Sequence, residues 1–427
     1  MVSNARFVPR AQGSQIADGD WIECCPPHSC GANPEFRALE VSVQTMTRRR
    51  SLAAVFSSCL GVGLIFGFQP PLIALTLSRL GYSSFAIGAV ISASLIAVIL
   101  CGPLYPRAIA RLGLKRSIVV GILFAAALLL FMPLYPSVGL WLTLRFIAGC
   151  ALGLVWIASE IWMNSVSGAE SRGTVMGIYG TVFSIGIVAG PVLLEFTGTQ
   201  GAKPFAVGAA CLILTLVPMM VLRQAAGAPQ EFTPLRGLSA ALRAAPLVML
   251  AAFVAGLVES ADLTLLPLFG LHSGLNEKAA LLLVAVFMVG NVVWQVPIGL
   301  LADRFGRKTL LGICAAASCI GPLLLQRWLS TPLLLWSLLF VWGGTLYAFY
   351  SQGVALLGEQ FAVENLPTAN TLFVMVYCLG GVIGPSAGGM AMDLWPGRGL
   401  PFLLSGAAAL MLGGLAVSFA RRGRPYL

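Results

Sequence analysis

Long apolar runs separated by short polar turns are the feature that most constrains how this chain can fold. Twelve such runs follow one another between about residue 51 and about residue 420. A helix needs about 20 apolar residues to cross the hydrocarbon core of a bilayer, and most of these runs reach that length. Only 10% of the 427 residues are charged, against about 25% in soluble domains. The sequence therefore predicts an all-α integral membrane protein with twelve transmembrane helices.

The predicted spans fall into two groups of six, separated by the polar segment 223–246. They are expected at about 51–77, 83–104, 117–136, 138–163, 174–196 and 203–222, and then at about 245–269, 277–301, 309–327, 331–356, 368–392 and 399–420. The domains expected are a disordered N-terminal tail at 1–47, an N-terminal six-helix bundle at 48–222, a cytoplasmic linker at 223–246, and a C-terminal six-helix bundle with a short basic tail at 247–427.

The basic residues predict how the helices are oriented. If the N-terminus is cytoplasmic, most lysines and arginines fall in the inner loops, as the positive-inside rule requires. Both termini are then cytoplasmic, and the expected location is the bacterial inner membrane. The net charge of +10 is thus explained by membrane topology, and no nucleic-acid partner is expected.

Cysteines and catalytic motifs give no sign of a cofactor. Seven of the ten cysteines lie in apolar runs, where they behave as small hydrophobic residues. The other three lie in CCPPHSC, residues 24–30, whose spacing fits no zinc pattern well. The chain has no Walker A or HExxH motif. We therefore expect no metal, no cofactor, no ATP-driven pumping and no enzyme activity.

An internal repeat relates the two groups of spans. GLLADRFGRK, residues 299–308, joins spans 8 and 9, and the weaker PRAIARLGLK, residues 106–115, joins spans 2 and 3. Aligning Gly113 with Gly306 gives an offset of about 193, which also relates GIVAGP in span 5 to GVIGP in span 11 within one residue. Repeats of six spans are a signature of secondary transporters.

Several motifs resemble those of the major facilitator superfamily, from about residue 48 to the end of the chain. GLLADRFGRK is similar to its cytoplasmic loop motif, and RFIAGCALG (145–153) is similar to its span-4 motif. GIYGTVFSIGIVAGP (177–191) resembles the span-5 motif of exporters, but it is followed by Leu194-Glu195 where a glycine pair is usual. GGVIGPSAGG in span 11 keeps that pair.

Finer features resemble the bacterial YcaD-like branch of that superfamily. They are ASEIWMNSVSGAESRGTVMGIYG (158–180), VVWQVPIGLLADRFGRK (292–308) and VIGPSAGGMAMD (382–393). The resemblance implies two pseudo-symmetric six-helix bundles that work by alternating access, with spans 1, 4, 7 and 10 lining a central cavity. It implies no particular substrate.

The charged loop between spans 8 and 9 is expected to act as a gate. Asp303 can pair with arginines or with helix amide ends, and Arg307 and Lys308 can bind the anionic inner leaflet. Such a latch would favour the outward-facing state; simple topology and turn formation are the alternative. The residues expected to take part are Gly299, Asp303, Arg304, Gly306, Arg307, Lys308 and Glu359, with Glu160 and Arg172 as a weaker pair in the first half, where Ala110 replaces the aspartate.

Glycines and prolines in spans 5 and 11 are expected to control helix packing. Gly186, Gly190 and Gly384 would let neighbouring helices approach closely. Pro191 and Pro385 would bend or interrupt their helices. A moving interface would use both properties, and static close packing is the alternative.

Two acidic residues in span 7, Glu259 and Asp262, are the strongest candidates for function, because a charge at membrane depth is costly. Their i,i+3 spacing predicts one helical face, and two close carboxylates repel when both are ionised. This arrangement favours proton coupling and would attract a cationic substrate. A structural ion pair with Arg145 in span 4 is the alternative.

Further polar residues within the spans can contact a substrate or can hydrogen-bond between helices. They are Gln69, which precedes Pro70-Pro71 where span 1 is expected to break, Asn291, Gln295, Tyr347 and Tyr350.

Together these features predict a secondary active transporter that moves a small organic solute by alternating access. Its expected partners are that solute, protons and the lipid bilayer, and it is expected to be a monomer. Export of an amphipathic or cationic compound is favoured over uptake. A solute-uptake symporter and a non-transporting receptor or scaffold on the same fold are the alternatives.

Overall fold

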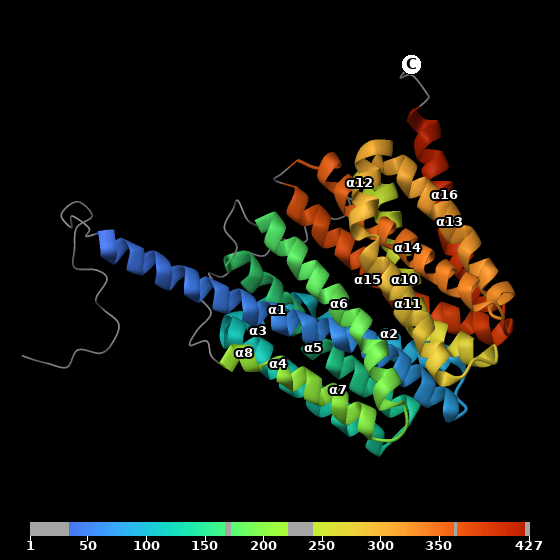
Figure 1. The fold of residues 1–427 in the computed structure, drawn as a ribbon, viewed down its shortest axis with the longest axis horizontal. Helices are drawn as coiled ribbons and strands as arrows, with labels where there is room; N and C mark the ends of the chain where they lie inside the picture. Colours follow the sequence, from blue (N-terminus) through green and yellow to red (C-terminus); the bar gives the residue numbers. More distant parts are fainter. Residues whose placement is uncertain (1–33, 167–171, 221–241, 363–364, 423–427) are drawn as a thin grey trace, which may run out of the picture. The chain divides into compact units, whose positions relative to one another are not determined.

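The computed structural model describes residues 34–166, 172–220, 242–362 and 365–422, which form helices joined by short turns (Figure 1). Residues 1–49 and residues 50–427 form two separate compact units. Helix α1 (Pro34–Arg79) begins in the first unit, within the tail predicted at 1–47. Everything described below belongs to the second unit.

The helices of the first half match the first six predicted spans. They are the rest of α1, then α2 (Ser84–Cys101) with α3 (Tyr105–Leu112), α4 (Leu114–Phe131), α5 (Val138–Val166), α6 (Arg172–Thr197), and α7 (Lys203–Leu214) with the short α8 (Val217–Met220). The linker predicted at 223–246 falls almost entirely outside the described residues.

The second half contains α10 (Pro246–His272), α11 (Glu277–Val293) with α12 (Gln295–Phe305), α13 (Arg307–Trp328), α14 (Pro332–Gln360), α15 (Leu366–Leu394) and α16 (Gly399–Arg422). Among the described residues, eleven helices are long and apolar enough to cross a membrane. The bent pair α11–α12, with an angle of 47° at the break, brings the number to twelve. The predicted all-α membrane fold is confirmed.

The two halves share the same turn at equivalent positions. Gly113 between α3 and α4 has φ +78°, and Gly306 between α12 and α13 has φ +83°. Each N–H closes the preceding helix, on the carbonyl of Ile109 at 2.8 Å and of Ala302 at 2.9 Å respectively. Left-handed backbone of this kind favours glycine, so both copies of the repeat depend on the same residue type.

Close helix packing also recurs at the repeat offset. A methyl group at Gly63 in α1 would overlap the carbonyl of Phe183 in α6, and one at Gly256 in α10 would overlap the carbonyl of Tyr377 in α15. Gly190 and Gly384, from α6 and α15, approach the partner backbones in the same way. The helix pairs α1–α6 and α10–α15 are therefore equivalent.

The expected break of span 1 at Pro70-Pro71 is wrong, because both prolines lie inside the continuous helix α1. Pro191 and Pro385 likewise lie inside α6 and α15, so neither interrupts its helix. Proline removes a backbone donor, but neighbouring helices and side chains commonly compensate for it in membrane proteins.

Two helix pairs join the halves: α2 packs along α15, and α6 runs beside α11 (Figure 1). Methyl groups at Gly88 in α2 and at Gly389 in α15 would overlap the carbonyls of Pro385 and Ser84 respectively. Ser92 donates to the carbonyl of Val382 at 2.6 Å. These contacts hold the two halves together.

Candidate functional site

A cavity lies between the two halves and is lined by α1, α2, α5 and α6 on one side and by α10 and α15 on the other. Most of the lining is apolar. Its polar side chains are Gln69, Ser94, Arg145, Glu259, Ser260 and Tyr377. The expectation that spans 1, 4, 7 and 10 line the cavity needs correction, because α14, the tenth span, contributes no lining residue, whereas α2, α6 and α15 do. The cavity is a site of the interface between the halves.

Arg145 of α5 lies in the wall of the first half and is only 5% exposed. Its guanidinium group donates to Gln69 Oε1 and, at 2.7 Å, to Ser94 Oγ. The expected alternative, an ion pair of Arg145 with the span-7 carboxylates, is not formed among the described residues. Both of its partners are neutral, so Arg145 fixes the polar groups of α1 and α2 around its own charge.

Glu259 of α10 lies in the opposite wall. Its carboxylate accepts a hydrogen bond from the Tyr377 hydroxyl at 2.8 Å. Tyr377 also contacts Tyr350 edge-on, with ring centroids 5.3 Å apart. An acidic side chain in the cavity is thus oriented by Tyr377 of α15, a residue that no sequence pattern singled out.

Asp262 is completely buried and does not line the cavity. The expectation that Glu259 and Asp262 act from one helical face is therefore only partly met. Glu259 lies in the cavity wall, and Asp262 lies inside the second half. Neither carboxylate oxygen of Asp262 has a hydrogen-bond partner among the described residues. A carboxyl group in such surroundings needs either a proton or a counter-ion.

The other polar candidates lie outside the cavity wall, apart from Gln69. Asn291, Tyr347 and Tyr350 contribute nothing to the lining. Gln295, at the break between α11 and α12, donates to Ser184 Oγ of α6 at 3.4 Å. That bond joins the halves, which matches the helix–helix alternative for Gln295.

An aromatic cluster that sequence analysis did not single out forms part of the cavity wall. Trp156 of α5 stacks with Phe183 of α6, with an interplanar angle of 22°, and Phe66 of α1 contacts both rings. Trp156 also donates to the Glu160 carboxylate at 2.8 Å. In sequence these aromatic residues look like ordinary core residues. The side chain of Arg172, the expected partner of Glu160, lies outside the described part.

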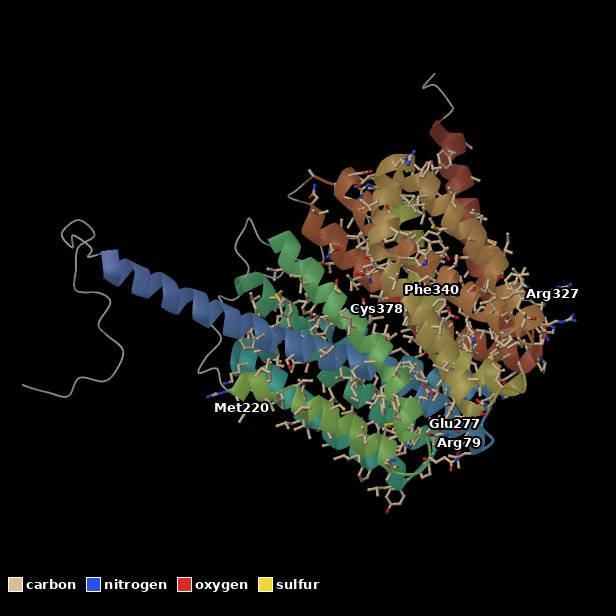
Figure 2. All side chains as sticks on the ribbon, in the orientation of Figure 1. Arg79, Met220, Glu277, Arg327, Phe340 and Cys378 are labelled. Atoms are coloured by element: carbon tan, nitrogen blue, oxygen red, sulfur yellow. The ribbon has the colours of Figure 1, made fainter. Side chains whose placement is uncertain are left out.

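Polar contacts join the halves at the end that holds the predicted outer loops, and these too were not foreseen. Asp393 at the end of α15 accepts from the N–H groups of Ser84 and Phe85, both at 2.9 Å. Arg79 donates to Thr199, which in turn donates to Glu277 of α11. Figure 2 shows Arg79 and Glu277 together at this end of the molecule. The halves are thus in contact on the predicted outer side.

The charged loop lies at the opposite end of the helices. Arg307, which was expected to bind the anionic leaflet, forms an ion pair with Glu359 of α14 at 2.8 Å, so two residues of the expected gate lie together. Asp303 and Arg304 are exposed, and the Asp303 side chain makes no hydrogen bond or ion pair with a described residue. Lys308 donates to Ser418 of α16 at 3.3 Å. The loop is therefore linked to its own half in this state.

Two helical repeats of six spans, around a central cavity that is largely apolar with a few polar side chains, are typical of a membrane transporter. The chain belongs to the Major Facilitator Superfamily, whose family model matches residues 52–284 and 274–426.

Curated relatives agree with this assignment. The chain is 23% identical to the uncharacterized MFS-type transporter YfkF of Bacillus subtilis (strain 168), over 80% of this chain and 89% of the relative. It is 26% identical to the uncharacterized MFS-type transporter YcaD of Escherichia coli O17:K52:H18 (strain UMN026 / ExPEC), over 81% and 90%. The resemblance to the YcaD-like branch is thus confirmed.

Solved structures show the same fold. The nucleoside transporter NupG superposes with a TM-score of 0.72 at 16% identity, covering 87% of this chain and 99% of that one. A bacterial homologue of the human lysosomal transporter Spinster, in an inward-facing and unoccupied conformation, superposes with a TM-score of 0.64 at 15% identity, over 88% and 93%.

Proposed function

We propose that this protein is a proton-coupled secondary transporter that exports a small organic solute by alternating access through the cavity between its halves. The observation that carries the proposal is the position of Glu259. This acidic side chain lies in the cavity wall, in the middle of a membrane-spanning helix, at the interface of the two repeats. A carboxyl group placed there can exchange a proton with water or with a solute bound in the cavity.

Asp262 is proposed as a second proton-binding group, with a role distinct from that of Glu259. The repeat offset matches Asp262 with Gln69, which Arg145 holds in the first half. Counted from the starts of α5 and α14, the position equivalent to Arg145 is Leu339. The second half therefore has an acid without the matching cation, so its buried carboxyl group depends on a proton for stability.

The conformational cycle is proposed to run between the present state, in which the predicted outer side is closed, and a second state in which that side is open. Contacts through Asp393 and Glu277 close the predicted outer side. Asp303 is exposed here, and it would pair with the first half when that side opens. The Arg307–Glu359 pair would keep the loop attached to α14 through the cycle.

The orientation in the membrane, the location and the oligomeric state are also proposed. Both termini would be cytoplasmic in a bacterial inner membrane, because the positive-inside rule favours that orientation. The proposed domain limits are those of the sequence, with two bundles at 48–222 and 247–427. Because the cavity lies within one chain, a monomer would suffice for transport.

Export of an amphipathic or cationic compound is proposed on the basis of the glycine–proline segment of α6 and of the acid in the cavity. Gly186 and Gly190 pack directly against the backbone of α1. The solved relatives do not select a cargo, since one is a nucleoside transporter and another a Spinster homologue, both at 15–16% identity.

The test uses the full-length protein in liposomes that contain a pH-sensitive dye. A panel of amphipathic amines is added across an imposed pH gradient, and solute-dependent proton movement is recorded for the wild type and for Glu259→Gln. The proposal expects flux in the wild type and none in a folded Glu259→Gln variant, with Glu195→Gln as a charge-matched control in α6. Saturable binding without flux would identify a receptor, and normal proton-driven transport by Glu259→Gln would refute the assignment of Glu259.

A further inference from the structure

The positive charge of Arg145 has no counter-ion among the described residues. The side chain is 5% exposed, and both of its hydrogen-bond acceptors, Gln69 and Ser94, are neutral. Its Nε has no hydrogen-bond partner in the described part of the chain. Burying an unpaired charge costs several kcal/mol. An anion bound next to the guanidinium group would offset that cost.

The acid of the cavity does not serve as that anion. Glu259 accepts from the Tyr377 hydroxyl and makes no ion pair with Arg145. Both side chains nonetheless line the same cavity, one from the first half and one from the second. The cavity therefore has a cation on one wall and an acid on the other.

The rest of the cavity lining is largely apolar and aromatic. Ile65, Leu152 and Leu263 belong to the lining. So do Phe66 and Trp156, whose rings meet edge-on with centroids 6.0 Å apart. A lining of this kind favours an apolar or aromatic body, while a few polar groups fix its orientation.

We infer that the transported solute is a small amphipathic zwitterion: its carboxylate binds Arg145, its amine faces Glu259, and its apolar body lies against the aromatic wall. The inference rests on the proposed function, because it assumes that cargo occupies this cavity. The amine end agrees with the cationic cargo proposed above, and the anionic end is new. Arginine suits this role because its planar fork matches a carboxylate and its charge persists when buried.

Three compounds with one common body test the charge pattern. Phenylalanine carries both groups, 3-phenylpropionate the carboxylate alone, and phenethylamine the amine alone. Each is titrated at millimolar concentrations onto the purified full-length protein, and the apparent Kd is taken from the rise in Tm. Phenylalanine is expected to bind most tightly, and 3-phenylpropionate is expected to bind detectably.

Variants then assign the carboxylate to Arg145. Arg145→Gln is expected to weaken binding of phenylalanine about 10- to 100-fold, since hydrogen bonds to charged groups contribute about 1.5–3 kcal/mol, while phenethylamine binds as before. Arg145→Lys keeps the charge and should retain part of the preference, which also controls for a folding defect. Lys203→Gln, which removes an exposed cation at the start of α7, should change nothing.

Three results would overturn the inference: tighter binding of phenethylamine than of phenylalanine, an unchanged order in folded Arg145→Gln, or no binding of any of the three compounds. The proposed function is judged separately by proton flux. If Glu259→Gln abolishes flux while Arg145→Gln keeps the wild-type preference, the zwitterion inference fails and the transporter proposal stands. If phenylalanine binds through Arg145 but never drives flux, the zwitterion-binding site stands and the transporter proposal fails.

Discussion

At the scale of single residues, the chain separates two acids that its sequence places three positions apart. Glu259 lines the cavity and accepts a hydrogen bond from Tyr377, whereas Asp262 is buried without a hydrogen-bond partner in the described part of the chain. A charge inside an apolar run marks both residues in the sequence. Which of them faces the cavity depends on how α10 packs against α15, and the sequence alone does not contain that rotation.

Removing the Tyr377 hydroxyl should weaken transport without unfolding the protein. Tyr377→Phe keeps the ring contact with Tyr350 but leaves Glu259 without its donor. We expect proton-coupled flux in liposomes to fall about tenfold or more, in line with the loss of a hydrogen bond to a charged group. Tyr135→Phe changes an exposed ring and serves as the control. Equal flux in the two variants would show that Tyr377 does not position Glu259.

At the scale of helices, the repeat seen in the sequence reappears as equivalent glycine contacts. The pairs α1–α6 and α10–α15 both use glycines to bring backbones into contact. The motifs predicted this for Gly186, Gly190 and Gly384, because small residues in membrane helices favour close approach. They did not predict Gly63 and Gly256, whose partners are known only from the packing, although Gly63 and Gly67 form a GxxxG pattern in the sequence.

Adding one methyl group at such a contact should destabilise the fold. Gly256→Ala would force α10 away from the Tyr377 carbonyl of α15, and overpacking of this kind typically costs about 1–3 kcal/mol. Gly406→Ala in α16 has open space around it and should be neutral or slightly stabilising, since alanine favours helix. The Tm of the two purified variants is the measurement. A Tm for Gly256→Ala at or above that of Gly406→Ala would contradict the packing.

At the scale of the whole molecule, charges at the helix ends distinguish the two sides. The loop motif made Asp303 and Arg307 stand out, because it carries four charges in ten residues of an apolar chain. Glu359 was expected to take part from its place at the inner end of span 10. Asp393 and Glu277, which join the halves on the opposite side, were not predicted. A single acid at a helix end is ordinary in sequence, and its partner across the interface lies 78 to about 310 residues away.

Neutralising Asp303 should favour the state described above, because that state gives its carboxylate no partner among the described residues. We expect Asp303→Asn to slow the labelling of the cavity thiol Cys378 from the predicted outer side. Arg111→Gln, in the weaker copy of the loop, is the control and should label at the wild-type rate. If Asp303→Asn also labels and turns over at the wild-type rate, the loop is not a latch.

Alternating access through the cavity is tested most directly by Cys378 in a chain whose other cysteines have been replaced. Thr199→Cys and Glu277→Cys are added, so that oxidation can lock the contact between these two positions. A membrane-impermeant maleimide is then applied from each side. We predict labelling of Cys378 only from the side of the termini while the lock is closed, and from both sides once it is reduced. Labelling from the opposite side through a closed lock, or from one side in both conditions, would contradict the account.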